Sequence, residues 1–259
     1  MLEPQIKFKN VSMFFDNLSK KDKILENLNF EIFAEEFVCI LGPSGSGKTT
    51  ILGLVAGFIK SFSGELFFNS KPIKRPDNSR TLVFQEYALF PWLNILDNVA
   101  FGLTTKNHSN KKAIREKALE YLNMVGLSNY KEHSVSQLSG GMKQRVAIAR
   151  ALAVDPEVLL LDEPFGALDL QTRESIQTEL SRLMTKTKKT VLFVTHSVDE
   201  ALKLADRILV IGGKPGKLLF DTTIAIAKPR DSNNHQLADI RNKILEKLSQ
   251  PDLFMGSDI

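Results

Sequence analysis

Gly42-Pro-Ser-Gly-Ser-Gly-Lys-Thr49 is the stretch of this sequence that decides its fold. It fits the pattern G-x-x-x-x-G-K-[ST] in full, and it lies between an apolar strand expected over Glu36–Leu41 and a helix expected over Gly47–Ile59. The glycines let backbone N–H groups surround phosphate oxygens where a Cβ would collide, and the helix turns its positive end toward the same anion. Lys48 is expected to reach the outer phosphates, and the Thr49 hydroxyl to ligate Mg²⁺. The stretch therefore predicts a nucleotide-binding loop. The residues expected to line it are Gly42, Pro43, Ser44, Gly45, Ser46, Gly47, Lys48, Thr49 and Thr50.

A second half of such a site follows at Val158-Leu-Leu-Leu-Asp-Glu-Pro164. An apolar strand that ends in Asp162 would place a carboxylate where it holds Mg²⁺ through water. Glu163, the next residue, could orient or deprotonate an attacking water molecule. A strand end capped by acidic residues is the simpler alternative, but two matching halves in the expected order favour a site for ATP and Mg²⁺.

The composition is that of an ordinary globular chain: of 259 residues, 43% are hydrophobic, enough for a sizeable core, and 25% are charged. The longest apolar run, Ile51–Ile59, is about half of what a membrane span needs. With no apolar targeting core at the N-terminus, a soluble, cytoplasmic protein is expected. The net charge of +4 comes from scattered lysines, so no nucleic-acid partner is expected. The single cysteine, Cys39, is expected to be buried in a strand.

The remaining periodicity predicts an α/β core. Apolar runs at 158–161 and 190–195 resemble central parallel strands, and Arg80–Phe84 is a further strand. The text GGKPG predicts a hairpin turn, and an amphipathic helix is expected over His235–Leu248. The expected organisation is one domain over 1–230, with a helical insertion at about 89–150, followed by a helical extension over 231–259.

A third element, Leu138-Ser-Gly-Gly-Met-Lys-Gln-Arg145, defines the class. Together with the two segments above and Val194-Thr-His-Ser197, it closely resembles the ATP-binding cassette (ABC) ATPase family over almost the whole chain. The resemblance implies a P-loop NTPase fold of the ABC type, α/β in class, with a helical subdomain and an N-terminal antiparallel β subdomain. It also implies ATP hydrolysis.

The family resemblance further implies a head-to-tail homodimer with two ATP molecules at the interface. Each ATP is gripped by the phosphate loop of one chain and the signature segment of the other. Ser139 is also expected to cap the helix that begins there. Carried over by position, the resemblance implies that Glu163 is the general base, that His196 contacts the γ-phosphate and that Gln85 senses Mg²⁺ and the attacking water. It implies metal ligation by Thr49, Gln85 and Asp162, and contacts of the signature segment with ATP through Ser139, Gly140, Gly141 and Gln144. It also implies a dimer contact by Asp169 and stacking on adenine by Phe15, with Phe14 as the alternative.

The apolar stretch Gln85–Leu103 contains PWLN and DNV, which resemble the nitrate/sulfonate/taurine branch of importers. The text IGGKPGK is similar to the S-x-R-P-G-R of that branch, with two departures. The resemblance implies a surface that couples the cassette to a membrane subunit, centred on Phe90–Leu96. An internal packing cluster is the alternative reading. The residues expected on the coupling surface are Tyr87, Phe90, Trp92 and Leu93.

Two functions remain open at this point. The favoured one is the ATP-hydrolysing subunit of an importer for nitrate, a sulfonate, taurine or a related small solute. Its partners would be integral membrane permease subunits and, indirectly, an extracytoplasmic solute-binding protein, and it would sit at the cytoplasmic face of the membrane. The alternative is a non-transport ABC ATPase acting on nucleic acid or the ribosome. A regulatory ATPase without a transporter is a third option.

Overall fold

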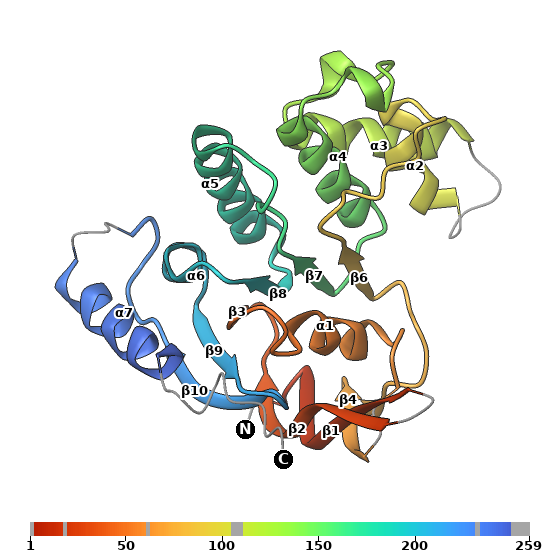
Figure 1. The fold of residues 1–259 in the computed structure, drawn as a ribbon. Coiled ribbons are helices and arrows are strands. Elements are labelled where there is room, and N and C mark those ends of the chain that lie inside the picture. The colour runs from red at the N-terminus through yellow and green to blue at the C-terminus, as the bar shows by residue number, and fades with distance from the viewer. Residues whose placement is uncertain (1–2, 18–19, 61–62, 105–110, 231–233, 250–259) are drawn as a thin grey trace. The chain divides into compact units, whose positions relative to one another are not determined.

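The computed structural model describes residues 3–17, 20–60, 63–104, 111–230 and 234–249 (Figure 1). The chain forms two compact units. The first contains the residues up to Asp77 and from Thr190 onward, and the second contains Asn78–Lys189.

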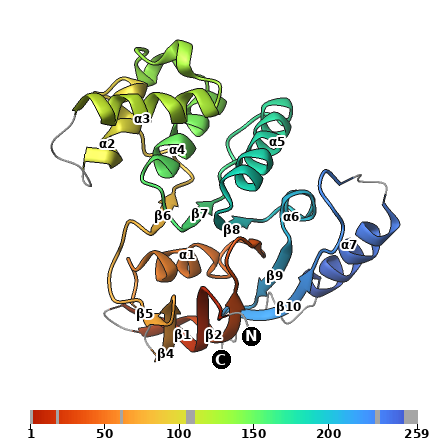
Figure 2. The same ribbon diagram turned by 180° about the vertical axis from the view of Figure 1, so that it is seen from behind.

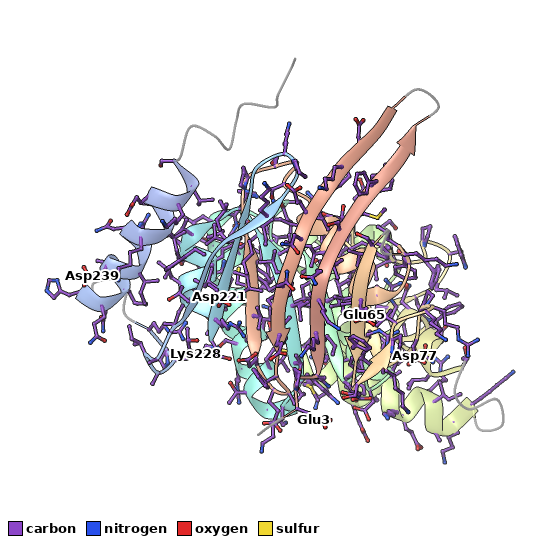
Figure 3. All side chains as sticks on the ribbon, turned by 90° about the horizontal axis from the view of Figure 1, so that it is seen from below. Glu3, Glu65, Asp77, Asp221, Lys228 and Asp239 are labelled. Carbon is purple, nitrogen blue, oxygen red and sulfur yellow. The ribbon has the colours of Figure 1, made fainter. Side chains whose placement is uncertain are left out.

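The first unit begins with an antiparallel sheet of strand order β2-β1-β4-β5. Its strands are β1 (Ile6–Asn17), β2 (Lys20–Ile32), β4 (Ser63–Phe68) and β5 (Lys71–Pro72). Figure 3 shows β1 and β2 as two long strands side by side, with Glu65 on the neighbouring β4. Ile6 and Phe8 alternate with exposed or half-buried lysines along β1, so one face of the sheet is buried. This sheet confirms the antiparallel β subdomain.

Four more strands of the first unit lie in the order β10-β9-β3-β8. They are β3 (Phe37–Leu41), β8 (Thr190–Thr195), β9 (Arg207–Gly212) and β10 (Lys217–Thr223). β3 is parallel to both β8 and β9, while β9 and β10 form the expected antiparallel hairpin. All five residues of β3 are buried, including Cys39, and burial raises the pKa of its thiol. The carboxyl ends of the parallel strands bring the loops after β3, β8 and β9 to one edge.

Three helices belong to the same unit: α1 (Lys48–Ala56), α6 (Val198–Leu204) and α7 (His235–Leu248). α1 is shorter than the helix expected over Gly47–Ile59. It ends because Gly57 takes a left-handed conformation with φ 81°, and a Cβ there would come within 2.5 Å of the Arg75 backbone. In α7, Leu237 and Ile244 are buried, which fits the amphipathic helix expected over His235–Leu248. Residues 231–233 and 250–259 of the expected C-terminal extension lie outside the described residues.

The second unit pairs β6 (Arg80–Val83) with β7 (Val158–Asp162) in parallel. Its α-helices are α2 (Ile95–Thr104), α3 (Lys111–Met124), α4 (Gly140–Ala153) and α5 (Leu170–Thr187), with short 3-10 turns η1 (Ser128–Tyr130) and η2 (Val135–Gln137). Figure 2 shows α2, α3 and α4 gathered into one group, which is the expected helical subdomain. In the described part of the chain, no helix is long and apolar enough to cross a membrane.

Candidate functional site

The phosphate loop runs from the end of β3 into α1. Gly45 and Gly47 have φ values of 80° and 88°, a left-handed conformation that a side chain would disfavour. Lys48 is 5% exposed, and its Nζ donates a hydrogen bond of 2.9 Å to the carbonyl oxygen of Pro43. The ammonium group is therefore folded back over the loop, and Thr49 in the first turn of α1 is exposed.

Ser46 supplies a test of whether the loop fits an anion. Its side chain is 2% exposed, and its Oγ has no hydrogen-bond partner among the residues that the structure describes. An unsatisfied buried hydroxyl costs about 1–3 kcal/mol, and a phosphate oxygen would give it a partner. The loop thus has the glycine backbone, the lysine and the orphaned donor that suit the phosphates of ATP.

The β9–β10 hairpin packs against the same loop, which the sequence did not indicate. A Cβ on Gly42 would lie 2.1 Å from the Ile211 carbonyl oxygen, and a Cβ on Gly216 would lie 2.1 Å from that of Ser46. At the tip of the hairpin, the Lys214 Nζ would lie 3.9 Å from a Cβ on Gly45. No ion pair of Lys214 occurs within the described ranges. The GGKPG text marked the turn, but its place beside the loop depends on β9 lying next to β3.

His196 is exposed and follows β8. A hydrogen-bond network fixes the turn around it: the Thr195 hydroxyl donates to a Glu200 carboxylate oxygen at 2.6 Å and accepts from the Ser197 N–H at 3.0 Å. The turn is therefore a firm platform for an exposed imidazole, which suits the predicted contact with the γ-phosphate.

The two candidate aromatic residues differ in their surroundings. Phe15 is 45% exposed, whereas Phe14 is half-buried, with the Lys23 ammonium 5.5 Å from its ring centroid. The greater exposed face favours Phe15 for stacking on adenine. Both belong to the first unit, as do the phosphate loop and His196.

The predicted carboxylates belong to the second unit, at the end of β7. Asp162 is 8% exposed, and Glu163 has the positive φ value of 42°, which is unusual for this residue type. The Gly166 N–H donates to the Glu163 carbonyl oxygen at 3.1 Å, and the Gln85 Nε2 would be 3.7 Å from a Cβ on Gly166. Gln85 therefore lies beside the loop that follows the predicted general base. Strained backbone of this kind clusters at functional sites.

The signature segment begins helix α4 as expected. Ser139 is the N-cap, and its Oγ accepts a 3.3 Å hydrogen bond from the Met142 N–H. A Cβ on Gly141 would lie 2.4 Å from the Thr172 methyl carbon of α5, so this glycine allows the two helices to approach closely. Gln144 requires a correction: its side chain is 0% exposed, so it cannot reach a nucleotide in this conformation. Within the described part of the chain, neither polar atom of its amide has a hydrogen-bond partner.

Asp169 has a definite local role. It is the N-cap of α5, and its carboxylate accepts a 3.0 Å hydrogen bond from the Thr172 N–H. That hydrogen bond lowers the pKa of the exposed Asp169 carboxyl group. In the predicted dimer, the Asp169 carboxylate would therefore have to contact the second chain while it also caps α5.

An aromatic cluster forms on the second unit from Phe90, Trp92 and Phe101. The Phe90 ring centroid lies 5.4 Å from that of Trp92 and 4.5 Å from that of Phe101. Trp92 is 76% exposed, so the reading of Trp92 as a core residue is wrong. Leu93 is half-buried.

Three residues within the stretch that was expected to form the coupling surface face the interior of the second unit instead. Ile95 and Leu96 are 0% and 4% exposed because they begin α2 and face the helical core, so the surface does not extend to Leu96. Tyr87 is half-buried, and a Cβ on Gly140 would lie 3.3 Å from its hydroxyl. Tyr87 therefore faces the start of α4, and burial raises the pKa of its hydroxyl group.

The expected metal ligands are a hydroxyl, an amide and a carboxylate: Thr49, Gln85 and Asp162. Among the described residues, no group of three or more His, Cys, Asp or Glu side chains could hold a metal ion by itself. Mg²⁺ takes few protein oxygens, keeps several waters and binds substrate phosphates, so a sparse oxygen donor set fits its chemistry.

These features have counterparts in known proteins. The ABC transporter family model matches residues 25–166. An uncharacterised ABC transporter ATP-binding protein of Methanocaldococcus jannaschii is 44% identical over 95% of this chain and 92% of its own length. The aliphatic sulfonates import ATP-binding protein SsuB of Bacillus cereus is 39% identical over 97% of this chain and 99% of its own length.

Two solved structures share the fold. The dimeric ATP-binding cassette MJ0796, in a post-hydrolysis state bound to ADP and Pi, has a TM-score of 0.76 and 35% identity, over 86% of this chain and 100% of its own. The protein cbiO1 of Clostridium perfringens, part of the ABC transporter complex cbiONQ, has a TM-score of 0.76 and 28% identity, over 85% of this chain and 89% of its own.

The fold and the loop define a P-loop ATPase of the cassette type. The chain belongs to the ABC transporter family, and it is an ATP-binding, ATP-hydrolysing subunit of that family.

Proposed function

We propose that this chain is the motor subunit of an ABC importer, and that it closes as a head-to-tail homodimer around two ATP molecules. The solute would be an aliphatic sulfonate, taurine, nitrate or a related small solute. The relationship to SsuB of Bacillus cereus, 39% identical along nearly the whole of both chains, favours this branch.

The observation that carries the proposal is the exposure of the aromatic cluster. A tryptophan that is 76% exposed, in tilted contact with a second aromatic ring, is a costly group to leave in water, and aromatic residues are enriched where proteins bind each other. In the chain, the cluster begins shortly after residues 85–88, which we call the Gln85 segment. This position suits a membrane permease subunit that senses the state of the nucleotide. We therefore place the chain at the cytoplasmic face of the membrane, held there by its partner, with a solute-binding protein acting on the far side.

In the proposed reaction, the loop amides and Lys48 hold the phosphates of ATP, and Phe15 stacks on adenine. Glu163 takes a proton from the attacking water, whose oxygen bonds to the γ-phosphorus while the bond to the β-phosphate oxygen breaks. ADP and phosphate are released, and the proton stays on the Glu163 carboxyl group until it exchanges with water. His196 contacts the γ-phosphate and helps to hold it in line.

A second copy of the chain would complete the site. Ser139 and the N–H groups of Gly140 and Gly141 begin a helix, so they offer a positive end to a γ-phosphate from across the dimer. The arrangement would stabilise charge that develops in the transition state. Mg²⁺, held by Thr49, Gln85 and Asp162, would offset the negative charge of the phosphates.

The experiment that tests this function uses Glu163→Gln. We expect this variant to bind ATP with the parent affinity, to lose turnover by about 10²–10³-fold, and to form a stable dimer with ATP. Dimer formation is measured by light scattering after size-exclusion chromatography, with ADP as the control nucleotide. Turnover at the parent rate would refute the role of Glu163, and a monomer with ATP would refute the closed dimer.

Importer function is tested by co-expression with a permease of the SsuB system type and a solute-binding protein. We expect a complex that takes up labelled solute only when the parent chain is present, and not with Lys48→Ala. Salt-sensitive nucleic-acid binding with no permease association would favour the non-transport alternative instead.

A further inference from the structure

The segment between β6 and the aromatic cluster has an unusual backbone. Tyr87 and Ala88 are consecutive residues with φ values of 47° and 46°, and neither is glycine. A left-handed conformation is strained for each such residue, so other contacts must hold this turn in place.

The contacts come from one side chain on α4. The Arg150 Nη1 donates a 2.7 Å hydrogen bond to the Ala88 carbonyl oxygen, and its Nη2 donates a 3.1 Å bond to that of Tyr87. Both strained residues are therefore held by one guanidinium group. The two donors have fixed relative positions in the planar group, a geometry that lysine cannot reproduce.

The same guanidinium group also contacts the aromatic cluster. Its central carbon lies 5.4 Å from the centroid of the Phe90 ring, the ring that makes tilted contacts with both Trp92 and Phe101. A cation over an aromatic face is attracted to the ring, and more strongly when water is excluded. Arg150 is half-buried. It reaches both the turn after Gln85 and the aromatic cluster, which is the proposed docking surface for the membrane subunit.

The turn contacts the other end of α4 as well. The Tyr87 hydroxyl lies against Gly140, in the first turn of the helix, while the Tyr87 carbonyl is held by Arg150 in the last turn. α4 packs closely on α2, which contains Phe101 of the aromatic cluster (Figure 1). The Gln85 segment, the signature helix and the aromatic cluster thus meet at one arginine.

We propose that Arg150 is a positioning residue that locks the Gln85 segment to the signature helix and passes movement between the nucleotide and the docking surface. Arg150 does not touch the reacting atoms; it acts by holding Tyr87 and Ala88 in the conformation that directs Gln85. This inference rests on the proposed function, because it takes Gln85 as a group that senses the γ-phosphate and the aromatic cluster as the docking surface.

The test compares Arg150→Ala and Arg150→Lys with Arg115→Ala in the full chain. Arg115 is the matched control, because it also joins two elements of the second unit, through a 2.6 Å ion pair from α3 to Asp97 of α2, without contacting the Gln85 segment. We expect both Arg150 variants to bind ATP within twofold of the parent affinity. Their kcat should fall by about 10–100-fold, because a misplaced positioning group is that costly. Arg115→Ala should keep the parent kcat.

The fluorescence of Trp92 reports directly on the aromatic cluster, because Trp92 is the single tryptophan of the chain. A purely structural role of Arg150 would leave the response of this fluorescence to ATP unchanged. We expect ATP with Mg²⁺ to shift the Trp92 emission of the parent and of Arg115→Ala, and we expect this shift to disappear in Arg150→Ala at saturating ATP.

Three results would overturn the inference. The first is an unchanged kcat in Arg150→Ala, and the second is a loss of ATP affinity in that variant in proportion to its loss of kcat. The third is the absence of an ATP-dependent shift of the Trp92 emission in the parent. If Glu163→Gln forms the ATP-bound dimer while any of these results holds, the positioning role is wrong and the proposed function stands. If Glu163→Gln fails instead, the proposed function itself is rejected.

Discussion

Gly216 lies directly on the carbonyl oxygen of Ser46, so close that a Cβ at 216 would be 2.1 Å from that oxygen. β2 holds Gly216 from the other side: its N–H donates to the Ile24 carbonyl at 2.8 Å, and its own carbonyl accepts from the Glu26 N–H at 2.9 Å. Because Gly216 cannot retreat, any side chain there must displace the phosphate loop.

Gly216→Ala is therefore expected to weaken ATP binding by about tenfold or more, or at least ~1.4 kcal/mol, while the chain stays folded. Isothermal titration with ATP measures the Kd. Gly126→Ala is the control: Gly126 is a left-handed glycine, with φ 70°, and the nearest atom to a Cβ there would be 3.7 Å away. That variant should lose stability without losing affinity. An unchanged Kd in Gly216→Ala would show that the loop tolerates the displacement.

The two lysines of the β9–β10 hairpin should differ in their effect on ATP. Lys214 lies beside Gly45, whereas the Lys217 ammonium is engaged at 2.8 Å with the Glu26 carboxylate. We expect Lys214→Ala to raise the Kd for ATP by about three- to fivefold, an effect that fades at high salt. Lys217→Ala should leave the Kd within twofold. Equal effects from both variants would point to a general charge effect instead of a contact with phosphate.

A charge placed at Trp92 should affect partner binding, whereas a charge placed at Leu96 should affect the stability of the fold. Trp92→Glu changes an exposed side chain, so the Tm should stay within about 2 °C of the parent and ATP should still bind. It should, however, lose the membrane partner in co-purification. Leu96→Glu buries a charge and should cost more than about 3 kcal/mol. If Trp92→Glu unfolds, or if it retains the partner, the aromatic cluster is not the docking surface.

Stability should depend on pH through Glu26. A hydrogen bond from Lys217, with a second from Lys23, lowers the pKa of its carboxyl group from 4.5 to about 2. Because the folded-state pKa is depressed, the stabilisation is full above the unfolded value and is lost as the pH falls toward 2. Urea denaturation should show that Glu26→Gln is less stable than the parent at pH 7, and that the difference shrinks between about pH 4.5 and pH 3. A difference that does not change with pH would contradict the role of the ionised carboxylate.

The sequence located well the elements that carry the predicted nucleotide-binding residues, because local patterns set them. The apolar runs at 158–161 and 190–195 became β7 and β8, and the GGKPG text became the turn between β9 and β10. Ser139 was expected to cap a helix and does so. Each of these features depends on residues close together in the chain.

Features that depend on long-range packing were missed or misplaced. Gln144 follows the signature pattern by position, yet the packing of the helical core buries it fully. Ile95 and Leu96 continue an apolar stretch that is exposed at Trp92, and only their place in α2 shows that they face inward.

By itself, then, the sequence determined the class of protein and the identity of its nucleotide-binding elements, because a phosphate loop needs a fixed local spacing of glycine, lysine and hydroxyl. The tertiary structure decided which side chains are available around that loop. It put Lys214 and Gly216 beside the phosphate loop, Trp92 in solvent, and Arg150 on the carbonyls of Tyr87 and Ala88, 63 and 62 residues away. The physical reason is that burial and hydrogen bonding between distant segments depend on how strands and helices pack, and no local pattern encodes that packing.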